Sequence, residues 1–442
     1  MVGISMIEMI RNNAARLDRH LREEFLALYR PFKHTPCYLH RPYEAFLNKK
    51  KKLPVIIKFK DTESISCQND MNLVKDIVSR YTGCQHRKDF KSIKSCSAIV
   101  TPTALKDILS SCNHVHKVYY NREVRALLDV ATPAIHADNL IRNDAQLTGE
   151  NVTIAVIDTG IFPHEDLRGR MKGFRDFINN RREPYDDNGH GTHCAGCALG
   201  DGTASDGKYK GPAPKAEVVG IKVLDKLGSG SLETVMEGVQ WAIDHKDELG
   251  IDVLSMSIGS PASSVYPNEN DDPMVQMVEA AWDAGMVVCV AAGNEGPDSG
   301  TISSPGISDK VITVGAIDDQ NTVSRTGDEI ASFSSRGPTL YNEIKPDVVA
   351  PGVNIVSLRS PRSYIDKQRD TRVDKYYTTL SGTSMATPIC AGLVALLLQY
   401  NRTLTPNEVK RMVMGSADAW GNGDPNVYGA GYINAEKTIP LA

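Results

Sequence analysis

The heptapeptide Gly-Thr-Ser-Met-Ala-Thr-Pro at residues 382–388 leads directly into an apolar run from Ile389 to Leu398. Such a run is typical of a buried helix, so Ser384 is expected at a helix N-terminus, where unpaired N–H groups and the positive end of the helix dipole lie. Pro388 is expected in the first helical turn, where a missing N–H is tolerated. Ser384 could be a helix cap or a nucleophile, and the choice depends on a base and an acid elsewhere in the chain.

The composition is that of an ordinary globular protein with two or three domains. The chain has 442 residues, of which 41% are hydrophobic and 24% charged. The net charge of −4 hides an asymmetry, because residues 1–120 hold 21 Lys and Arg against 11 Asp and Glu, and residues 121–442 hold 29 against 43. The two parts are expected to attract each other. The basic part has no basic motif interleaved with aromatic residues, so no nucleic-acid partner is expected.

The sequence predicts neither an export signal nor a membrane-spanning segment. Residues 1–14 include Glu8 and Arg11 and have no continuous apolar region, so no signal peptide is expected. No run approaches the 18 apolar residues of a membrane span. The nine cysteines are odd in number and widely spread, which is typical of unpaired thiols in a reducing compartment. We therefore expect a cytoplasmic location.

Residues 1–52 are predicted to form an amphipathic helix over 6–30 and a linker over 31–52. Apolar residues recur at helical spacing over 6–30, with arginines on the other face. Such a helix could lie on a membrane surface, but packing on the protein or a partner is the interpretation we favour. The linker is predicted from three prolines and a run of four lysines.

Residues 53–120 predict a small α+β domain of ferredoxin-like pattern: strand, helix, strand, strand, helix, strand. The expected strands and helices lie at 55–59, 70–81, 89–93, 97–100, 102–111 and 116–120. Residues 121–150 are predicted to be a connecting segment.

From residue 151 to 442, strands and helices alternate with short glycine-rich joins, which predicts an α/β domain with a doubly wound, mostly parallel sheet. Buried strands are expected at 152–157, 217–223, 253–257, 287–291 and 312–316. Functional sites of such sheets form at the carboxyl ends of the strands.

Three polar residues, Asp158, His190 and Asn294, are the candidates for such a site. Asp158 ends the first strand, where a carboxylate could be desolvated or could simply cap a turn. His190 stands among glycines in Asn-Gly-His-Gly-Thr-His, where backbone can approach an imidazole closely. His193, three residues later, lacks the further ligands of a metal pair and is expected to be structural. Asn294 follows another strand and could donate to a negative oxygen or merely form a turn.

Together the four motifs, Val-Ile-Asp-Thr-Gly, His-Gly-Thr-His-Cys-Ala-Gly, Ala-Ala-Gly-Asn-Glu-Gly and Gly-Thr-Ser-Met-Ala-Thr-Pro, occur in one order over residues 151–437. This part resembles the subtilisin-like serine proteases, and in particular the bacterial intracellular alkaline type. The order Asp158, His190, Ser384 is that of subtilisin itself. The resemblance implies that Ser384 is the nucleophile, His190 the general base and then acid, and Asp158 the residue that orients the imidazole. It also implies that Asn294 and the Ser384 N–H form the oxyanion hole.

The resemblance further implies a peptide-binding cleft. Two segments match the family's substrate walls, which pair with the main chain of a peptide and so select little for sequence. A serine endopeptidase of broad specificity is expected, with a preference for apolar or aromatic residues before the cut. The expected substrate-binding residues are Gly228, Ser229, Gly230, Ser257, Ile258, Gly259 and Gly293.

The sequence also departs from the family pattern. Cys194 and Cys197 could be a redox pair, but two buried thiols under the active site are the better interpretation. The family's calcium site needs an Asp after the first strand, which Asp166 could supply, and a loop that residues 200–207 match poorly. No required cofactor and no metal ligand are therefore expected, and calcium is kept as an open alternative. Residues 262–272 and 360–375 are predicted surface insertions.

The expected partners are protein or peptide substrates and an intramolecular one, since residues 53–120 resemble the inhibitory prodomain of these proteases. A processing site is expected within 121–150. The alternative function is a binding or chaperone module, with the N-terminal domain clamped on a latent active site.

Overall fold

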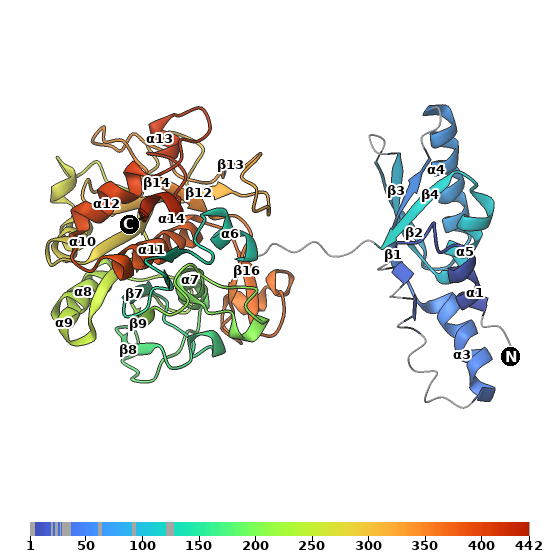
Figure 1. Ribbon diagram of the computed structural model, residues 1–442, viewed down its shortest axis with the longest axis horizontal. Helices are drawn as coiled ribbons and strands as arrows, with labels where there is room; N and C mark the ends of the chain where they lie inside the picture. The colour runs from blue at the N-terminus through green and yellow to red at the C-terminus, as the bar shows by residue number, and fades with distance from the viewer. Residues whose placement is uncertain are drawn as a thin grey trace. The chain divides into compact units, whose positions relative to one another are not determined.

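A computed structural model describes the chain over residues 5–18, 21–22, 25–26, 28, 37–60, 64–90, 94–120 and 128–441. The chain divides into two compact units, Met1–Val124 and Arg125–Ala442. The units are drawn in blue to cyan and in green to red in Figure 1.

The N-terminal unit contains one antiparallel sheet of strand order β2-β3-β1-β4. Alternate residues of β1, from Leu53 to Phe59, are buried, so one face of the sheet carries the core of this unit. The order along the chain is strand, helix, strand, strand, helix, strand, with bounds β1 Leu53–Phe59, α4 Ser64–Ser79, β2 Gln85–Phe90, β3 Ser95–Val100, α5 Pro102–Ser111 and β4 Val115–Tyr120.

The single helix predicted over 6–30 is wrong in its extent. Helix α1 covers only Ser5–Asn12, and Leu17 then forms a β-bridge with Val118 of β4. The Arg16 guanidinium donates to the carbonyls of Leu109, Cys112 and Val115, so this stretch pairs with the sheet instead of continuing the helix. Leu17, Leu21 and Phe25 are fully buried in the core of this unit. Packing on the protein, which the sequence favoured over a membrane surface, is thus confirmed for these side chains.

The linker predicted over 31–52 is also wrong in part, because residues 37–50 form helix α3 (Cys37–Lys50) despite Pro42 in its interior. Leu47 of this helix is buried in the core, and the Asn48 carbonyl accepts a hydrogen bond from Thr103 Oγ1 of α5. Tertiary packing thus offsets the cost of the internal proline. Residues 31–36 lie outside the described part of the chain.

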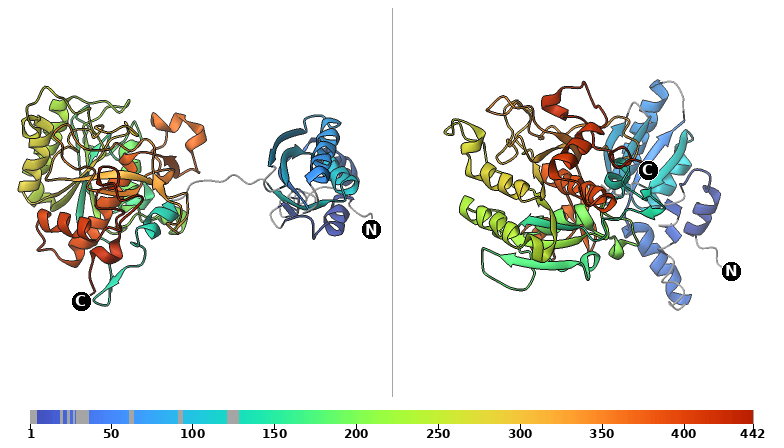
Figure 2. Two further views of the ribbon diagram at one scale, coloured as in Figure 1. Left: turned by 90° about the horizontal axis from the view of Figure 1, so that it is seen from above. Right: turned by 60° about the vertical axis from the view of Figure 1, so that its left-hand side comes forward.

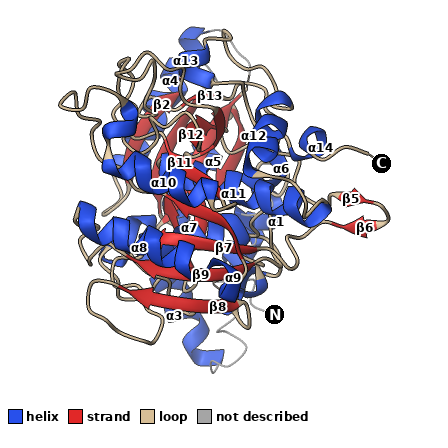
Figure 3. Cartoon of the chain, turned by 90° about the vertical axis from the view of Figure 1, so that its left-hand side faces the viewer, coloured by secondary structure: helices blue, strands red, loops and turns tan. Residues whose placement is uncertain are grey.

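The C-terminal unit is built on an eight-stranded sheet (Figure 3, red), of order β13-β12-β11-β10-β7-β9-β8 with β14 beside β12. All pairings are parallel except that of the edge strand β13. This confirms the predicted mostly parallel α/β sheet. The bounds are β7 Thr153–Asp158, β8 Met171–Asp176, β9 Glu217–Lys222, β10 Ile251–Met256, β11 Val287–Ala291, β12 Ile312–Asp318, β13 Glu329–Ile330 and β14 Val348–Pro351.

The predicted strands agree with β7, β9, β10, β11 and β12 to within about two residues, since each is a continuous apolar run typical of a sheet covered on both faces. Strand β8, with sequence Met-Lys-Gly-Phe-Arg-Asp, was missed because it lies at a half-exposed edge and lacks that apolar pattern.

Two pairs of helices pack on this sheet. Helix α11 lies against α7 and against strands β10 to β12, whereas α8 and α10 run side by side (Figures 1 and 2). The helical bounds are α6 Leu128–Ala134, α7 His190–Leu199, α8 Leu232–Asp244, α9 Lys246–Leu249, α10 Pro273–Asp283, α11 Thr383–Tyr400, α12 Pro406–Gly415, α13 Pro425–Tyr428 and α14 Ala435–Thr438. Among the described residues, only α11 is long and apolar enough to cross a membrane, and 83% of it is buried inside the protein.

Residues 128–150 belong to the C-terminal unit. They form α6 and a short hairpin, β5 Ile141–Arg142 and β6 Ala145–Gln146. The buried Arg142 guanidinium donates to the carbonyls of Glu436 and Ile439, and Gln399 Oε1 accepts from two backbone N–H groups, those of Thr148 and Gly149. This part of the predicted connecting segment is therefore held on the C-terminal unit by these hydrogen bonds, and residues 121–127 lie outside the described part.

A buried acid after β12 gives a prediction for stability. Asp319 is 1% exposed and its Oδ2 has no hydrogen-bond partner among the described residues. Burial, helped by the charge of Asp328, raises the pKa of Asp319 to about 7 from an ordinary value of 3.8. The folded state thus holds this proton more tightly than the unfolded state does. The stability that the proton contributes is fully present below about pH 3.8 and is lost as the pH rises from there through about 7.

We expect Asp319→Asn to raise the melting temperature by a few degrees at pH 8.5 and by clearly less at pH 5, where only part of this stability has been lost, measured by calorimetric unfolding. The control is Asp247→Asn, since the Asp247 side chain is 99% exposed and no such difference is expected. An equal shift at both pH values would contradict the assignment.

Candidate active site

The predicted polar residues meet at the carboxyl ends of the parallel strands. Asp158 ends β7, and Asn294 follows β11. A cleft of about 650 Å³ is lined by His190 and Asn294, and an adjoining cavity of about 180 Å³ by Asn294 and Ser384. Asn294 and the segment 257–260 line both, so these cavities form one continuous site.

Asp158 and His190 form a close pair at the base of this site. His190 Nδ1 lies 2.8 Å from Asp158 Oδ1 and 2.9 Å from Oδ2, and the Asp158 side chain is fully buried. Burial lowers the pKa of His190, but the Asp158 charge and its hydrogen bond outweigh burial and raise that pKa well above 6.5. With Nδ1–H donating to the carboxylate, the neutral imidazole carries its lone pair on Nε2.

Ser384 is the second residue of α11, after the N-cap Gly382. Its Oγ donates to the Ser257 carbonyl at 3.3 Å, and Ser257 Oγ donates to the Ser384 carbonyl at 2.7 Å. This double contact joins α11 to the end of β10. The sequence expectation of a helix N-terminus at Ser384 is confirmed.

The prediction that Pro388 lies in the first helical turn is wrong. Because α11 begins at Thr383, Pro388 lies in the second turn. Having no N–H, Pro388 cannot donate to the Ser384 carbonyl four residues earlier. That carbonyl instead accepts from Ser257 Oγ and, at 3.4 Å, from Cys194 Sγ. Because Pro388 leaves this carbonyl without a donor inside the helix, Ser257 and Cys194 can both donate to it and so hold the backbone of Ser384.

Thr383 fixes the orientation of Asn294. Asn294 Oδ1 accepts from Thr383 N at 2.9 Å and from Thr383 Oγ1 at 3.1 Å, and Thr383 Oγ1 accepts from Gly293 N. Because Oδ1 is occupied by these donors, the amide is held in one flip state, with its NH₂ group on the other side. Sequence reasoning missed Thr383, although its place beside Ser384 was a possible signal.

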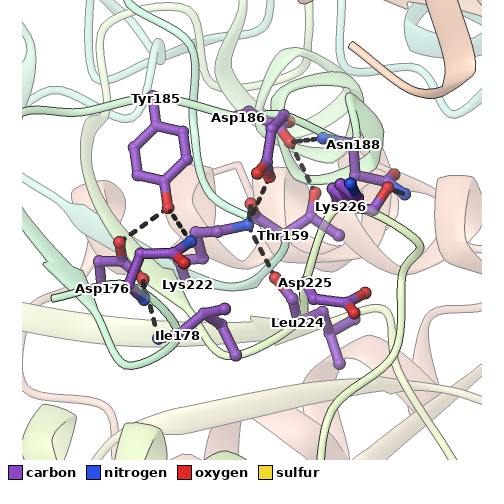
Figure 4. A network of polar contacts seen from close by, with 12 residues as sticks. Thr159, Asp176, Ile178, Tyr185, Asp186, Asn188, Lys222, Leu224, Asp225 and Lys226 are labelled. Carbon is purple, nitrogen blue, oxygen red and sulfur yellow. Dashed lines mark hydrogen bonds and ion pairs between the residues drawn. The ribbon is translucent and has the colours of Figure 1, made fainter. Parts of the chain in front are cut away.

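Asp186 organises the loop before His190 (Figure 4). This carboxylate is 5% exposed. Its Oδ1 accepts from Thr159 Oγ1, Asn188 N and Gly189 N, and its Oδ2 accepts from both N and Oγ1 of Thr192. Thr159 directly follows Asp158, and Thr192 lies in α7. The Asp186 carboxylate therefore connects β7, which ends at Asp158, to α7, which begins at His190.

Lys222, the last residue of β9, stabilises the same part of the structure (Figure 4). Its fully buried Nζ donates to the carbonyls of Thr159 and Leu224 and to Asp187 Oδ1, at 2.6, 2.8 and 2.8 Å. Three oxygens thus satisfy the buried ammonium. Sequence reasoning also missed Asp186 and Lys222, since each looks like an ordinary charged residue beside a motif.

The predicted substrate walls border the cleft. Gly228, Ser229 and Gly230 lie along it together with Ser257, Ile258 and Gly259, whereas Gly293 lines only the adjoining cavity. A side chain at Gly230 would bring its Cβ within 2.5 Å of the Val223 carbonyl, so glycine is required for this close approach.

The neighbouring histidine and cysteines are structural. His193 is fully buried, its Nε2 lies 3.0 Å from the Ile355 carbonyl, and burial lowers its pKa to about 3. Cys194 and Cys197 are fully buried, and burial raises both thiol pKa values. Asp158, His190 and Cys194 are close enough to share a metal ion, but His190 Nδ1 and the Asp158 carboxylate are already hydrogen-bonded to each other.

The surroundings of Asp166 do not fit the calcium site considered from the sequence. Its carboxylate accepts from Gly202 N at 3.1 Å, Ala204 N at 2.9 Å and the Tyr377 hydroxyl at 2.7 Å, and His164 Nδ1 lies 3.6 Å away. These donors use the oxygens that an ion would need.

Comparison with known proteins agrees with this geometry. The model of the "Peptidase_S8: Subtilase family" matches residues 149–431. Serine protease AprX of Bacillus subtilis (strain 168) is 55% identical over 446 residues, covering 100% of both chains. Subtilisin E of the same organism is 33% identical over 395 residues, covering 86% of this chain and 89% of the relative.

Among solved structures, Sphericase has a TM-score of 0.57 and 28% identity, covering 70% of this chain and 97% of its own. A cold-adapted subtilisin-like serine proteinase has a TM-score of 0.51 and 29% identity, with the same coverage. The fold is that of the subtilisins, and the chain is a subtilisin-type serine protease. The chain belongs to the subtilase family.

We expect Asp186→Asn to lower kcat/KM for a chromogenic peptide about 100-fold, because an amide NH₂ would face the Thr192 or Gly189 donors and displace His190. Circular dichroism should show an unchanged fold. The control Asp144→Asn removes an exposed carboxylate in the turn between β5 and β6 and should leave kcat/KM unchanged. Full activity of Asp186→Asn would contradict the positioning role.

Proposed function

We propose that the chain is an endopeptidase of broad specificity that cleaves proteins through an acyl-enzyme on Ser384. The observation that carries this proposal is the buried Asp158–His190 pair in a cleft continuous with the cavity of Ser384 and Asn294. Neither the base nor the nucleophile needs a metal or cofactor for this chemistry, so none is proposed as required.

In the first step, Ser384 Oγ attacks the scissile carbonyl carbon while His190 Nε2 takes the hydroxyl proton. The hydroxyl must leave the Ser257 carbonyl, its present acceptor at 3.3 Å, and turn to the imidazole. The imidazolium, stabilised by the Asp158 carboxylate, then returns the proton to the leaving amine. A water molecule then attacks the ester carbonyl carbon while His190 Nε2 accepts a proton from it. The imidazolium returns this proton to Ser384 Oγ, which releases the acid product and restores Ser384.

The negative oxygen of the tetrahedral intermediate needs donors that are already in place. The Ser384 N–H at the start of α11 and the Asn294 NH₂ are the proposed donors. Thr383 holds the Asn294 amide in place because its N–H and its hydroxyl both donate to Oδ1, which leaves the NH₂ group available for the substrate oxygen. Preorganised donors cost no reorganisation during the reaction.

Substrate binding is proposed along Gly228–Gly230 and Ser257–Gly259. Main-chain pairing with these segments would bind an extended peptide with little regard to its sequence, which accounts for broad specificity. Glu295 at the rim could also admit a basic residue before the cut.

We further propose that the N-terminal unit is a ferredoxin-like inhibitory prodomain. Two observations support this: its order of strands and helices with the sheet order β2-β3-β1-β4, and its excess of basic residues against an acidic catalytic part. A cytoplasmic location is proposed as well, supported by the seven described cysteines that form no disulfide.

Ser384→Ala should lower kcat for a peptide substrate by about 10⁶-fold, the size of the loss in subtilisin when its serine is removed. The fold should remain, because α11 keeps its cap and the Ser384 carbonyl keeps its donors. Thermal unfolding and peptide hydrolysis of the purified variant test this. Turnover at the wild-type rate would refute the proposed nucleophile.

The raised pKa of His190 sets the pH dependence. The base must be neutral, and Asp158 keeps it protonated to a higher pH, so kcat/KM should fall as the pH drops through a value above 6.5. Asp158→Asn removes the charge that raises this pKa, so the acid limb of the much slower variant should move to lower pH. A pH–rate profile measures both, and an acid limb that does not move would contradict the coupling.

A prodomain that is removed by cleavage and a permanently latent module predict different products when the purified chain is incubated. Incubation of the purified chain should yield a cut near residues 121–135 that is absent in Ser384→Ala, with activity rising as the cut appears. Mass spectrometry of the new N-terminus and a parallel peptide assay would show this. Persistent full-length, inactive wild-type chain would favour the latent module.

A further inference from the structure

A long loop, residues 359–376, joins the two strands of a short antiparallel hairpin, β15 Ile355–Leu358 and β16 Tyr377–Leu380. It contains the stretch 360–375, which the sequence predicts to be a surface insertion. Two residues of this loop, Tyr364 and Ile365, instead line the large cleft together with His190. The loop is therefore part of the active-site cleft, and none of the catalytic steps described for Ser384 uses it.

The loop is hydrogen-bonded to the segment that leads to His190. It binds three consecutive carbonyls there: the donors Ser360 Oγ, Tyr364 N and Ile365 N lie 2.6, 2.8 and 2.9 Å from the carbonyl oxygens of Asp186, Asp187 and Asn188, respectively. Gly189 permits this close approach, because a Cβ at that position would lie 2.7 Å from Ser363 Oγ. The cleft-lining residues of the loop are thus fixed in place relative to His190.

A buried carboxylate holds the loop in this conformation. Asp366, which directly follows Ile365, is 4% exposed. Its Oδ2 accepts from Arg362 N at 2.7 Å and from Arg359 Nη2 at 3.0 Å. The Arg372 Nε lies 2.8 Å from its Oδ1. Charge-assisted hydrogen bonds of this kind are strong, so the loop is preorganised and loses little conformational freedom when a substrate binds against it.

Tyr364 and Ile365 together, here called the loop wall, offer an apolar surface to a substrate. The Tyr364 side chain is 44% exposed, and that of Ile365 is half-buried. Lys367 Nζ lies 5.1 Å from the centre of the Tyr364 ring, a cation–π contact that helps to hold the ring. Leu224 lines the same cleft. A substrate side chain that contacts Leu224 and the loop wall would therefore bury apolar surface.

The alternation of side chains along an extended peptide indicates which substrate residue meets the loop wall. The residue before the cut lies at the small cavity lined by Asn294 and Ser384. Successive side chains of an extended chain point to opposite faces. The second residue before the cut therefore points away from the small cavity. Of the two cavities, only the large cleft contains His190 and the loop wall.

We infer that Tyr364 and Ile365 bind the second substrate residue before the cut and select an apolar side chain at that position. The inference rests on the proposed endopeptidase function and deepens it. Main-chain pairing with the segments 228–230 and 257–259 is indifferent to substrate sequence, whereas the loop wall contacts a side chain. The predicted insertion thus gives an otherwise broad protease one position of side-chain selectivity.

The test uses the purified full-length chain after incubation, and peptide p-nitroanilides that differ only in having Leu or Gly as the second residue before the cut. In the wild-type chain, kcat/KM should be about tenfold higher for the leucine peptide than for the glycine peptide, and Tyr364→Ala should lower this ratio about fivefold. Tyr364→Phe keeps the apolar ring and should keep the ratio. Ile365→Ala is a second variant and should also lower it.

The matched control is Gln368→Ala, which removes an exposed side chain of the same loop that does not line the cleft. Both kcat/KM values should be unchanged in this variant. Circular dichroism of each variant should match that of the wild-type chain.

The possible failures are distinguishable. Hydrolysis of both peptides with the same ratio in the wild-type chain, Tyr364→Ala and Ile365→Ala would overturn this inference and leave the proposed function intact. Internally quenched peptides that vary the residue after the cut provide a further check, because a selectivity change at that residue alone would also overturn the inference. Absence of hydrolysis by the wild-type chain would overturn the proposed function, and this inference with it.

Discussion

The geometry around His190 depends on the buried carboxylate of Asp186. Its five accepted hydrogen bonds connect the end of β7, the loop before α7 and the first turn of α7. Asp158 and His190 are 32 residues apart, yet Thr159 and Thr192 are bound to the same carboxylate. The short Asp158–His190 distance follows from this arrangement, because neither residue can move without breaking hydrogen bonds that water cannot replace in a dry interior.

A second constraint acts from the side of α11. Pro388 removes one helical hydrogen bond, and the Ser384 carbonyl that it releases is taken up by Ser257 and Cys194. The Cys194 thiol lies 3.8 Å from His190 Nδ1 as well. Strand β10, helix α7 and helix α11 therefore share contacts at one carbonyl, which places the serine, the histidine and the substrate wall in a single rigid body.

Motifs that are local in sequence could be predicted, and contacts between distant segments could not. Asp158, His190, Asn294 and Ser384 each stand in a short distinctive stretch, and the long apolar strands between them defined the sheet. Asp186 carries no such signal, since its role is set by donors from three segments. Helix α3 was missed because Pro42 and the lysines at its end suggest a linker, whereas the packing of Leu47 in the core and the contact with α5 stabilise it.

The fastening of residues 128–150 has a topological consequence. Ala435 N donates to the Ile135 carbonyl, and Arg142 binds the carbonyls of Glu436 and Ile439, so the first and last elements of the catalytic unit lie side by side. Neighbouring ends are the condition under which a chain can be circularly permuted. A short linker could join residue 441 to residue 128, and new ends could be opened in an exposed loop, with the sheet and its site left intact.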